Sequence, residues 1–334
     1  EDRKTINELL KYPEDSAGSI MTAEYIGLKK YMNVEQAFAY IRAHGVDKET
    51  IYTCFVTDAQ RRLEGVVTIK DLLMNPYDMK IQDIMDENVI KAVTTEDQEE
   101  VVDLFNKYDL MCLPVVDHED RLVGIVTVDD VVDVMEEEAT EDIEKMAAIV
   151  PTDKPYMKTT VFETWKKRIP WLLLLMISAT FTGSIITSFE DALSACVVLT
   201  AYIPMLMDTG GNAGGQASVT IIRGLSLNEI EFKDAFRVLW KEARVAVLCG
   251  LTLAAANFVK LLLLDHVTIA VAAVVCLTLI AAVFIAKVIG CLLPMLAKKI
   301  GFDPAVMASP FITTIVDALS LLIYFSIATA VMHI

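Results

Sequence analysis

A single carboxylate, Asp317, lies in an apolar segment that is long enough to cross a membrane. Residues 304–332 contain no other Asp, Glu, Lys or Arg. A carboxylate at the centre of a bilayer costs at least ~2.5 kcal/mol on insertion scales, so it persists where it faces water, a cation or an opposite charge. We therefore predict that Asp317 lines the path of an ion or substrate. The alternative is a structural ion pair, for which Lys287 in the preceding apolar segment is the candidate partner.

Two of the apolar segments carry further groups that suit cation binding. In residues 192–222, four glycines and several polar side chains would destabilise a helix that faces lipid, so they indicate close backbone contacts or a water-filled path. In the last segment, Ser309, Thr313 and Asp317 recur every four residues and therefore share one face of a helix. The candidate pore residues are Asp208, Gly211, Asn212, Ser309, Thr313 and Asp317.

A second concentration of acids occupies residues 129–144, which contain no Lys or Arg. Several of these acids are three or four residues apart, a spacing at which like charges destabilise an isolated helix. A solvated helix face is one explanation. The alternative is a surface that binds hard divalent cations, which prefer carboxylate oxygens and can join two acidic surfaces. We favour this cation sensor, and a facing acidic surface occurs earlier in the chain at Asp97, Glu99 and Asp109.

The charge distribution separates the chain into an acidic part and an apolar part. Residues 1–150 carry a net charge of −19 and residues 151–334 a net charge of +2, and 54% of all residues are hydrophobic. This division predicts a soluble domain joined to a membrane domain, and it argues against nucleic acid as a partner because the acidic part repels phosphate. Scattered histidines and six cysteines without Cys-x-x-Cys spacing predict neither an enzyme nor a zinc site.

The acidic part contains two similar segments. Each has an Ile-Met start, an amphipathic helix (33–43 and 95–108) and two short β-branched strands that flank a polar turn (58–62 and 117–121). A helix with an aspartate in its first turn then follows. One such unit cannot cover its own sheet, so we expect the two units to pack as a pair.

This pattern resembles a tandem pair of CBS domains, with units at 19–81 and 82–135. The resemblance implies that Thr127 and Asp130 hold the ribose of a nucleotide, with Pro114 beside them, and that Thr68 and Asp71 are the equivalents in the first unit. The alternative is that both aspartates only cap the starts of helices.

Five apolar segments follow the acidic part, at 170–189, 192–222, 245–264, 267–296 and 304–332, and each can span a bilayer. Basic residues gather before the first segment, between the second and third, and between the fourth and fifth. By the positive-inside rule, this alternation predicts that the acidic part is cytoplasmic and that the C-terminus lies outside. We expect the loop between the second and third segments to contain Arg223, Lys233, Arg237, Lys241 and Arg244.

The whole arrangement resembles the MgtE family of magnesium channels. The most specific likeness is in Thr209-Gly210-Gly211-Asn212 with Gln216, and in Ser309-Pro310 with Asp317. The resemblance implies α/β tandem CBS domains followed by an all-α polytopic membrane domain of five transmembrane helices (169–334), with an acidic connecting segment (136–168) between them. Because the chain begins with Glu1, we also expect it to be part of a longer protein, with residues 1–18 the tail of a helical domain.

The same resemblance implies a homodimeric Mg²⁺ channel of the cytoplasmic membrane, in contact with lipid, in which Asp317 of each subunit meets the other at the axis. It also implies ATP as a second ligand and closure of the channel by cytoplasmic Mg²⁺. The implied sensor residues are Asp97, Glu99, Asp109, Asp130, Asp133, Glu138, Glu141, Asp142 and Asp303. Two alternatives remain, an ion-coupled secondary transporter and a membrane-anchored nucleotide sensor.

Overall fold

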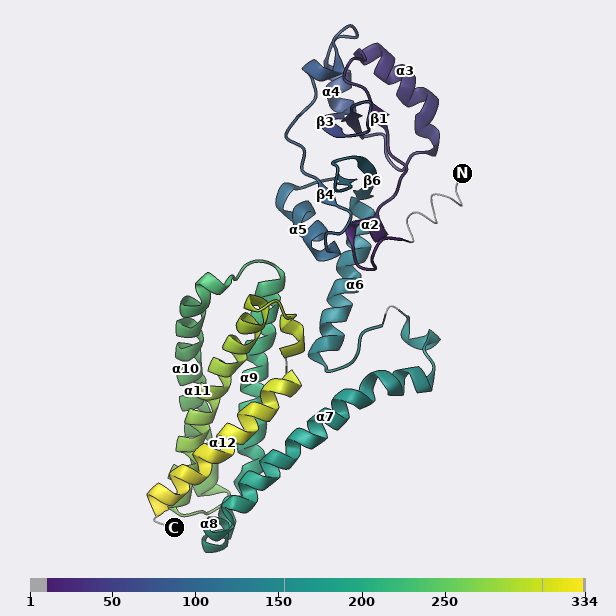
Figure 1. The fold of residues 1–334 in the computed structure, drawn as a ribbon. Helices are drawn as coiled ribbons and strands as arrows, with labels where there is room; N and C mark the ends of the chain where they lie inside the picture. The colour runs from purple at the N-terminus through teal and green to yellow at the C-terminus, as the bar shows by residue number, and fades with distance from the viewer. Residues whose placement is uncertain (1–10, 153, 308, 333–334) are drawn as a thin grey trace. The chain divides into compact units, whose positions relative to one another are not determined.

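The computed structural model describes residues 11–152, 154–307 and 309–332, with the side chain of Ser309 excepted. The chain divides into two compact units, which meet in sequence between Ala139 and Thr140 (Figure 1). This division falls inside one helix, α6 (Val128–Met146). The predicted connecting segment 136–168 is therefore shared between the two units. Of the predicted N-terminal tail, residues 1–10 lie outside the described part of the chain.

The first unit contains two three-stranded sheets with the same topology. In each sheet the central strand pairs in parallel with the strand before it and antiparallel with the strand after it. The first sheet consists of β1 (Gly27–Leu28), β2 (Thr53–Thr57) and β3 (Leu63–Thr68), and the second of β4 (Ala92–Val93), β5 (Cys112–Val116) and β6 (Leu122–Thr127). The main helices are α2 (Ala17–Ile20), α3 (Val34–His44), α4 (Ile69–Met74), α5 (Gln98–Tyr108) and α6.

The start of each repeat packs in the core of the other repeat. Met21 belongs to the core around β4, β5 and β6, and an added Cβ at Gly124 would lie 2.6 Å from its sulfur. Met85 packs in the same way on the first sheet, where a Cβ at Gly65 would lie 2.8 Å from the Met85 sulfur. The absence of a side chain at these two glycines therefore permits the crossing. The predicted boundary between residues 81 and 82 therefore divides residues that pack in the same core.

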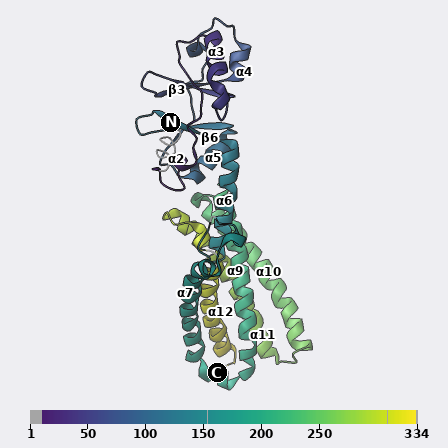
Figure 2. The same cartoon turned by 90° about the vertical axis from the view of Figure 1, so that its right-hand side faces the viewer.

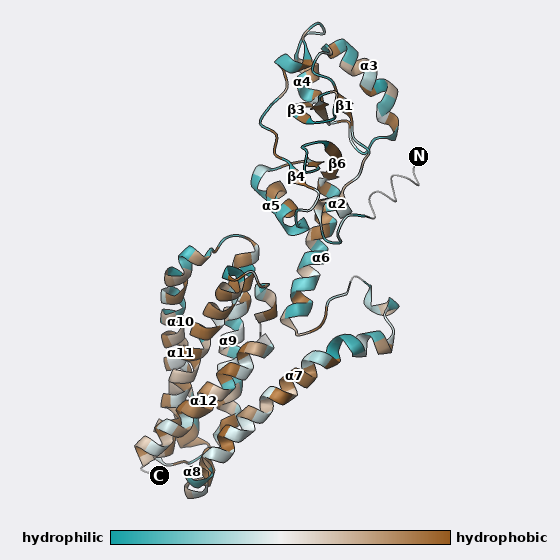
Figure 3. Ribbon diagram, in the orientation of Figure 1, coloured by the Kyte–Doolittle hydropathy of each residue, from teal (hydrophilic) through white to brown (hydrophobic). Residues whose placement is uncertain are grey.

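The second unit is helical. Its helices are α7 (Val161–Ser188), α8 (Glu190–Ala195), α9 (Ile203–Ser226), α10 (Ala235–Leu263), α11 (Ile269–Lys299) and α12 (Ser309–Met332). Among the described residues, four helical segments are long and apolar enough to cross a membrane: Val161–Ser188, Phe232–Leu263, Ile269–Lys299 and Pro304–Met332. The second predicted segment corresponds to α9, which lies outside this set and carries more pale and teal residues than α11 (Figure 3).

Helix α10 begins about ten residues before the apolar segment predicted at 245–264. Arg237, Lys241 and Arg244, which we placed in a loop, are therefore residues of α10, and Arg223 lies in α9. The difference arises because backbone hydrogen bonding extends a helix through polar residues as readily as through apolar ones. As a result, a helix can extend well beyond the apolar window that reveals it.

Helix α9 contacts both α11 and α12, and Figures 1 and 2 show it alongside them. Its glycines allow this close packing. A Cβ at Gly211 would lie 2.9 Å from Thr313 of α12, and one at Gly214 would lie 3.1 Å from the Ala286 carbonyl oxygen of α11. Of the two explanations that the glycines allowed, close backbone contact is therefore the one realised at Gly211 and Gly214.

We predict that Gly290→Ala destabilises the helical unit by about 1–3 kcal/mol, the range typical of overpacked cores. The new methyl group would overlap the backbone carbonyl oxygen of Gly214, which a side-chain rotation cannot relieve. Thermal unfolding of the purified protein in detergent measures the effect. Gly183→Ala is the matched control, because a Cβ there would meet no atom within 4 Å. Equal unfolding temperatures for the two variants would contradict the packing argument.

Candidate functional site

Helix α9 has two chemically different faces. Gly210, Gly211 and Gly214 are buried against the neighbouring helices, whereas the side chains of Asp208 and Asn212 are exposed. Gln216, one turn further on, is also exposed. Because residues four apart lie on one side of a helix, these three polar side chains form a single stripe. The stripe would be costly against lipid and therefore suits a face that meets water or a partner.

Asp317 of α12 lies near this stripe. Its carboxyl group is half-buried, and the negative charge of Asp208 acts on it directly. Within the described part of the chain, neither carboxylate makes a hydrogen bond or an ion pair. Two like charges without a counter-charge repel one another, and a cation between them would remove the repulsion.

Lys287 does not neutralise Asp317. Its ammonium nitrogen lies 3.5 Å from a carboxylate oxygen of Glu242, and the two side chains are only 6% and 14% exposed. The structural pairing that we considered between Lys287 and Asp317 is therefore wrong. The sequence analysis overlooked Glu242 because it lies before the apolar window that marked the third segment. A buried charge such as Lys287 requires a partner, which is the signal that could have led to it.

The hydroxyl groups of Thr313 and Thr314 donate to the backbone of α12 itself. Thr313 donates to the Pro310 carbonyl oxygen at 2.9 Å, and Thr314 donates to the same oxygen at 3.1 Å. The Thr313 methyl group faces Gly211, so the main observed role of both residues is packing. The side chain of Ser309, a predicted pore residue, lies outside what the structure describes.

Three of the predicted sensor acids lie close together in the second unit. Lys145, near the end of α6, contacts Glu141 at 2.6 Å and Asp303 at 2.7 Å. Although burial lowers the pKa of Lys145, its hydrogen bonds to Asp303 and Glu141 raise the pKa above its ordinary value. Burial and the neighbouring Asp303 raise the pKa of Asp142. The groups that could bind a cation here are therefore mostly carboxylates, and they already bind one cation, the ammonium group of Lys145.

The end of α6 also makes apolar contacts. Met146 packs against Ile222 of α9 and Ala305, which follows Asp303 in the connection between α11 and α12. The acids and the apolar contact thus join the end of α6 to α9 and to the connection between α11 and α12. The sequence analysis did not assign a role to Lys145.

The other predicted sensor acids lie apart in the first unit. The side chain of Asp97 accepts a hydrogen bond from the Glu99 amide and caps α5, and Glu138 accepts one from Gln98. Asp109 adopts a left-handed backbone conformation at the end of α5, and Asp133 is exposed. Among the described residues, no three His, Cys, Asp or Glu side chains are arranged to hold a metal ion. The carboxylate chemistry suits a hard dication, but a complete set of ligands is not assembled there.

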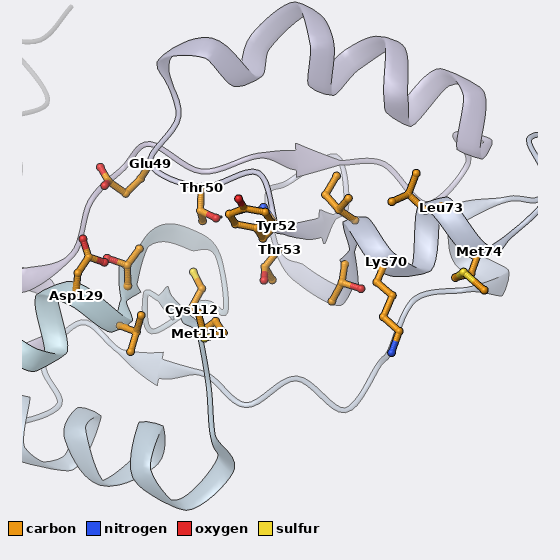
Figure 4. Close-up of a pocket in the computed structure, with 14 residues that line it drawn as sticks. Glu49, Thr50, Tyr52, Thr53, Lys70, Leu73, Met74, Met111, Cys112 and Asp129 are labelled. Atoms are coloured by element: carbon orange, nitrogen blue, oxygen red, sulfur yellow. The ribbon is translucent and has the colours of Figure 1, made fainter.

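The first unit also contains a pocket of about 800 Å³, which both repeats line (Figure 4). Tyr52 and Thr68 come from the first repeat, and Met111 and Thr127 from the second. Figure 4 shows Lys70 and Asp129 toward opposite ends of the pocket. The lining surface is mostly apolar, with hydroxyl groups, one lysine and the carboxylates of Glu49 and Asp129. This combination can hold an aromatic ring and an anionic group of one ligand.

The residues that we predicted to bind a nucleotide have other partners in the structure. Thr127 lines the pocket and donates its hydroxyl to Asp130 at 2.7 Å, and Thr68 donates to Asp71 at 2.5 Å. Both aspartates therefore make the helix-start contacts that we gave as the alternative role. Pro114 is buried in β5, where it pairs with Ile125. Lys70, which the motif did not indicate, supplies the cationic group.

Comparisons with known proteins agree with this architecture. The MgtE family model, described as a divalent cation transporter, matches residues 203–327, and the CBS domain model matches residues 17–77 and 81–137. The chain is 40% identical to the magnesium transporter MgtE of Thermus thermophilus, over 98% of this chain and 72% of that protein. It is 36% identical to MgtE of Bacillus subtilis, over 99% of this chain and 73% of that protein.

Among solved structures, the crystal structure of the cytosolic domain of the Mg²⁺ channel MgtE in complex with ATP covers 40% of this chain and 53% of its own, with 45% identity and a TM-score of 0.39. The matches to whole MgtE proteins extend over both units, and the CBS matches coincide with the two sheets. They confirm the predicted combination of CBS domains with a helical membrane domain. The chain belongs to the MgtE family of magnesium transporters.

Proposed function

We propose that this chain forms, as a homodimer, a Mg²⁺ channel whose path is lined by Asp208 and Asp317. The observation that carries the proposal is the exposed polar stripe of α9 beside the uncompensated Asp317. A second copy of the chain would cover this stripe and remove it from lipid. The basic residues Lys166, Lys167 and Arg168, which precede the apolar part of α7, support a cytoplasmic first unit.

The stripe suits a hydrated ion better than a bare one. Mg²⁺ gives up its water ligands reluctantly, and carboxylate and amide oxygens accept hydrogen bonds from bound water. Asp208, Asn212 and Gln216 offer such oxygens on successive turns, and Asp317 adds a second carboxylate. Long-range attraction by the carboxylates then favours dications, while contact through water keeps release fast.

Asp317→Asn should lower Mg²⁺ flux into liposomes about tenfold or more, because one negative charge per subunit leaves the path. The same change relieves repulsion with Asp208, so the unfolding temperature should stay equal or rise. Asp191→Asn, an exposed acid of α8, is the control and should keep wild-type flux. Wild-type flux in the Asp317→Asn variant would remove Asp317 from the path.

An ion-coupled secondary transporter is the competing function. A channel needs no second ion, so flux should persist in liposomes that carry neither a proton gradient nor a sodium gradient. Flux that stops when both gradients are collapsed would favour coupled transport, with Asp208 or Asp317 as the coupling group.

We further propose that the acids of α6 and Asp303 sense cytoplasmic Mg²⁺ and close the path. Glu141, Asp142 and Asp303 would hold the cation, which would supply positive charge between two acidic elements. This charge would hold the end of α6 against the connection between α11 and α12. The acids of the first unit, which carry most of the negative charge of the chain, would contribute a second surface in the dimer.

Millimolar Mg²⁺ should protect residues 140–168 of the full chain from proteases, because a bound cation holds the end of α6 in place. Digestion followed by mass spectrometry locates the cleavage sites. KCl at the same ionic strength is the control for screening, which acts on all charges alike. Cleavage that does not depend on Mg²⁺ would exclude the sensor.

The pocket of the first unit is the proposed nucleotide site. Apolar side chains such as Ile69 and Leu73 would contact the base, and Thr68 and Thr127 offer hydroxyl oxygens to the ribose. Lys70 would hold the phosphates as a cation. The family resemblance, which implies ATP, supports the same class of ligand.

Lys70→Met should weaken ATP binding about tenfold, the effect of losing one charge-assisted hydrogen bond. Isothermal titration of the full chain with ATP measures the affinity. The control is Lys80→Met, an exposed lysine of the first unit that does not line the pocket. Unchanged affinity in the Lys70→Met variant would place the phosphates elsewhere.

A further inference from the structure

Lys145 is a basic residue in direct contact with two of the proposed sensor acids. Its ammonium group bridges Glu141 and Asp303, which are far apart in the sequence. Arg223 also acts on Asp142, but the structure gives it no ion pair there. Two carboxylates thus contact the bridging ammonium group, and a third, Asp142, feels its charge. The ammonium occupies the position between two carboxylates where a dication would bind.

We propose that Lys145 is a built-in competitor that sets the Mg²⁺ concentration at which this surface binds a cation. The inference rests on the sensor function proposed above and identifies the residue that tunes it. A dication that binds Glu141 and Asp303 must first displace the ammonium group. The cost of breaking both contacts is therefore part of every binding event, and it raises the Mg²⁺ concentration required.

The burial of Lys145 permits such an exchange. Its side chain is 24% exposed, and those of its partners are 37% and 33% exposed, so the ammonium can move into water. The contrast is Lys287, which is 6% exposed and lies among the membrane helices with Glu242. Lys287 has no comparable route to solvent. Lys145 is thus placed for exchange, whereas Lys287 is placed for permanent pairing.

The end of α6 does not depend on Lys145 alone for its position. Met146 continues to contact Ile222 and Ala305 when the ammonium group is removed. The remaining carboxylates then attract a dication more strongly, because a positive charge about 4 Å away no longer repels it. Loss of Lys145 should therefore raise the affinity of the surface and leave its location unchanged.

The test is the Mg²⁺ midpoint for protection of residues 140–168 from protease, measured on the full chain in detergent. Lys145→Met should lower this midpoint about tenfold, and Lys145→Arg, which keeps the charge, should stay within about twofold of wild type. The matched control is Lys154→Met, which removes an ion pair to Glu163 in the same region and should leave the midpoint unchanged. A parallel titration with Mn²⁺, followed by its electron paramagnetic resonance signal, reports binding without proteolysis.

The outcomes separate this inference from the sensor function. An unchanged or higher midpoint in Lys145→Met, with normal protection of the wild type, would overturn the competitor role and leave the sensor intact. A higher midpoint would identify Lys145 as a tether that holds α6 in place. Loss of Mg²⁺-dependent protection in every variant and in the wild type would overturn the sensor and the competitor together. If Lys145→Met does not fold, Lys145→Gln removes the same charge.

Discussion

Negative charge without a counter-charge is the constraint on which the helical unit depends. Asp208 and Asp317 repel one another in a largely apolar bundle, and no described side chain forms an ion pair with either of them. Elsewhere in the bundle a buried charge is neutralised, since Glu242 pairs with Lys287. The lack of a counter-charge at Asp317 is therefore particular to this position and is not a general property of the bundle. A cation between the two carboxylates would relieve their repulsion, and this is the link between the pair and the transport proposed above.

Helix α9 makes this arrangement possible because it separates packing from chemistry. Its glycines allow α11 and α12 to approach so closely that even a methyl group at Gly211 or Gly214 would meet neighbouring atoms. The opposite face keeps Asp208 and Asn212 exposed. A helix with larger side chains on its packed face would move these polar groups away from α12. The low hydropathy of α9, which distinguishes it from the other long helices, thus follows from its two roles.

The sequence predicts those features of the fold and of the candidate site that depend on a residue and its neighbours along the chain. Asp317 is recognisable because a lone charge in an apolar window has few explanations, and the tandem repeat is recognisable from strand and turn patterns. The partner of Lys287 was not predictable from apolar windows, because α10 extends through polar residues that end such a window. Contact between Lys145 and Asp303 was equally hidden, since it joins residues that are far apart in sequence. Thr68 and its aspartate show a third limit: the same two side chains suit a helix cap and a ribose, and spacing does not distinguish the two roles.

The carboxylates of the proposed path and those of the proposed sensor must bind the same ion with different strengths. Along the proposed path, rapid passage requires weak contacts, and water ligands between Mg²⁺ and the oxygens keep each contact weak. At the end of α6, a useful switch requires binding that changes sharply near the resting Mg²⁺ concentration. The proposed competition would provide this adjustment, because a lysine that must leave would lower the apparent affinity without removing any ligand. The proposed path, whose charged groups are all acids, and the proposed sensor, which combines acids with an ammonium group, would thus attract the same dication in two ways, the first suited to rapid passage and the second to a defined threshold.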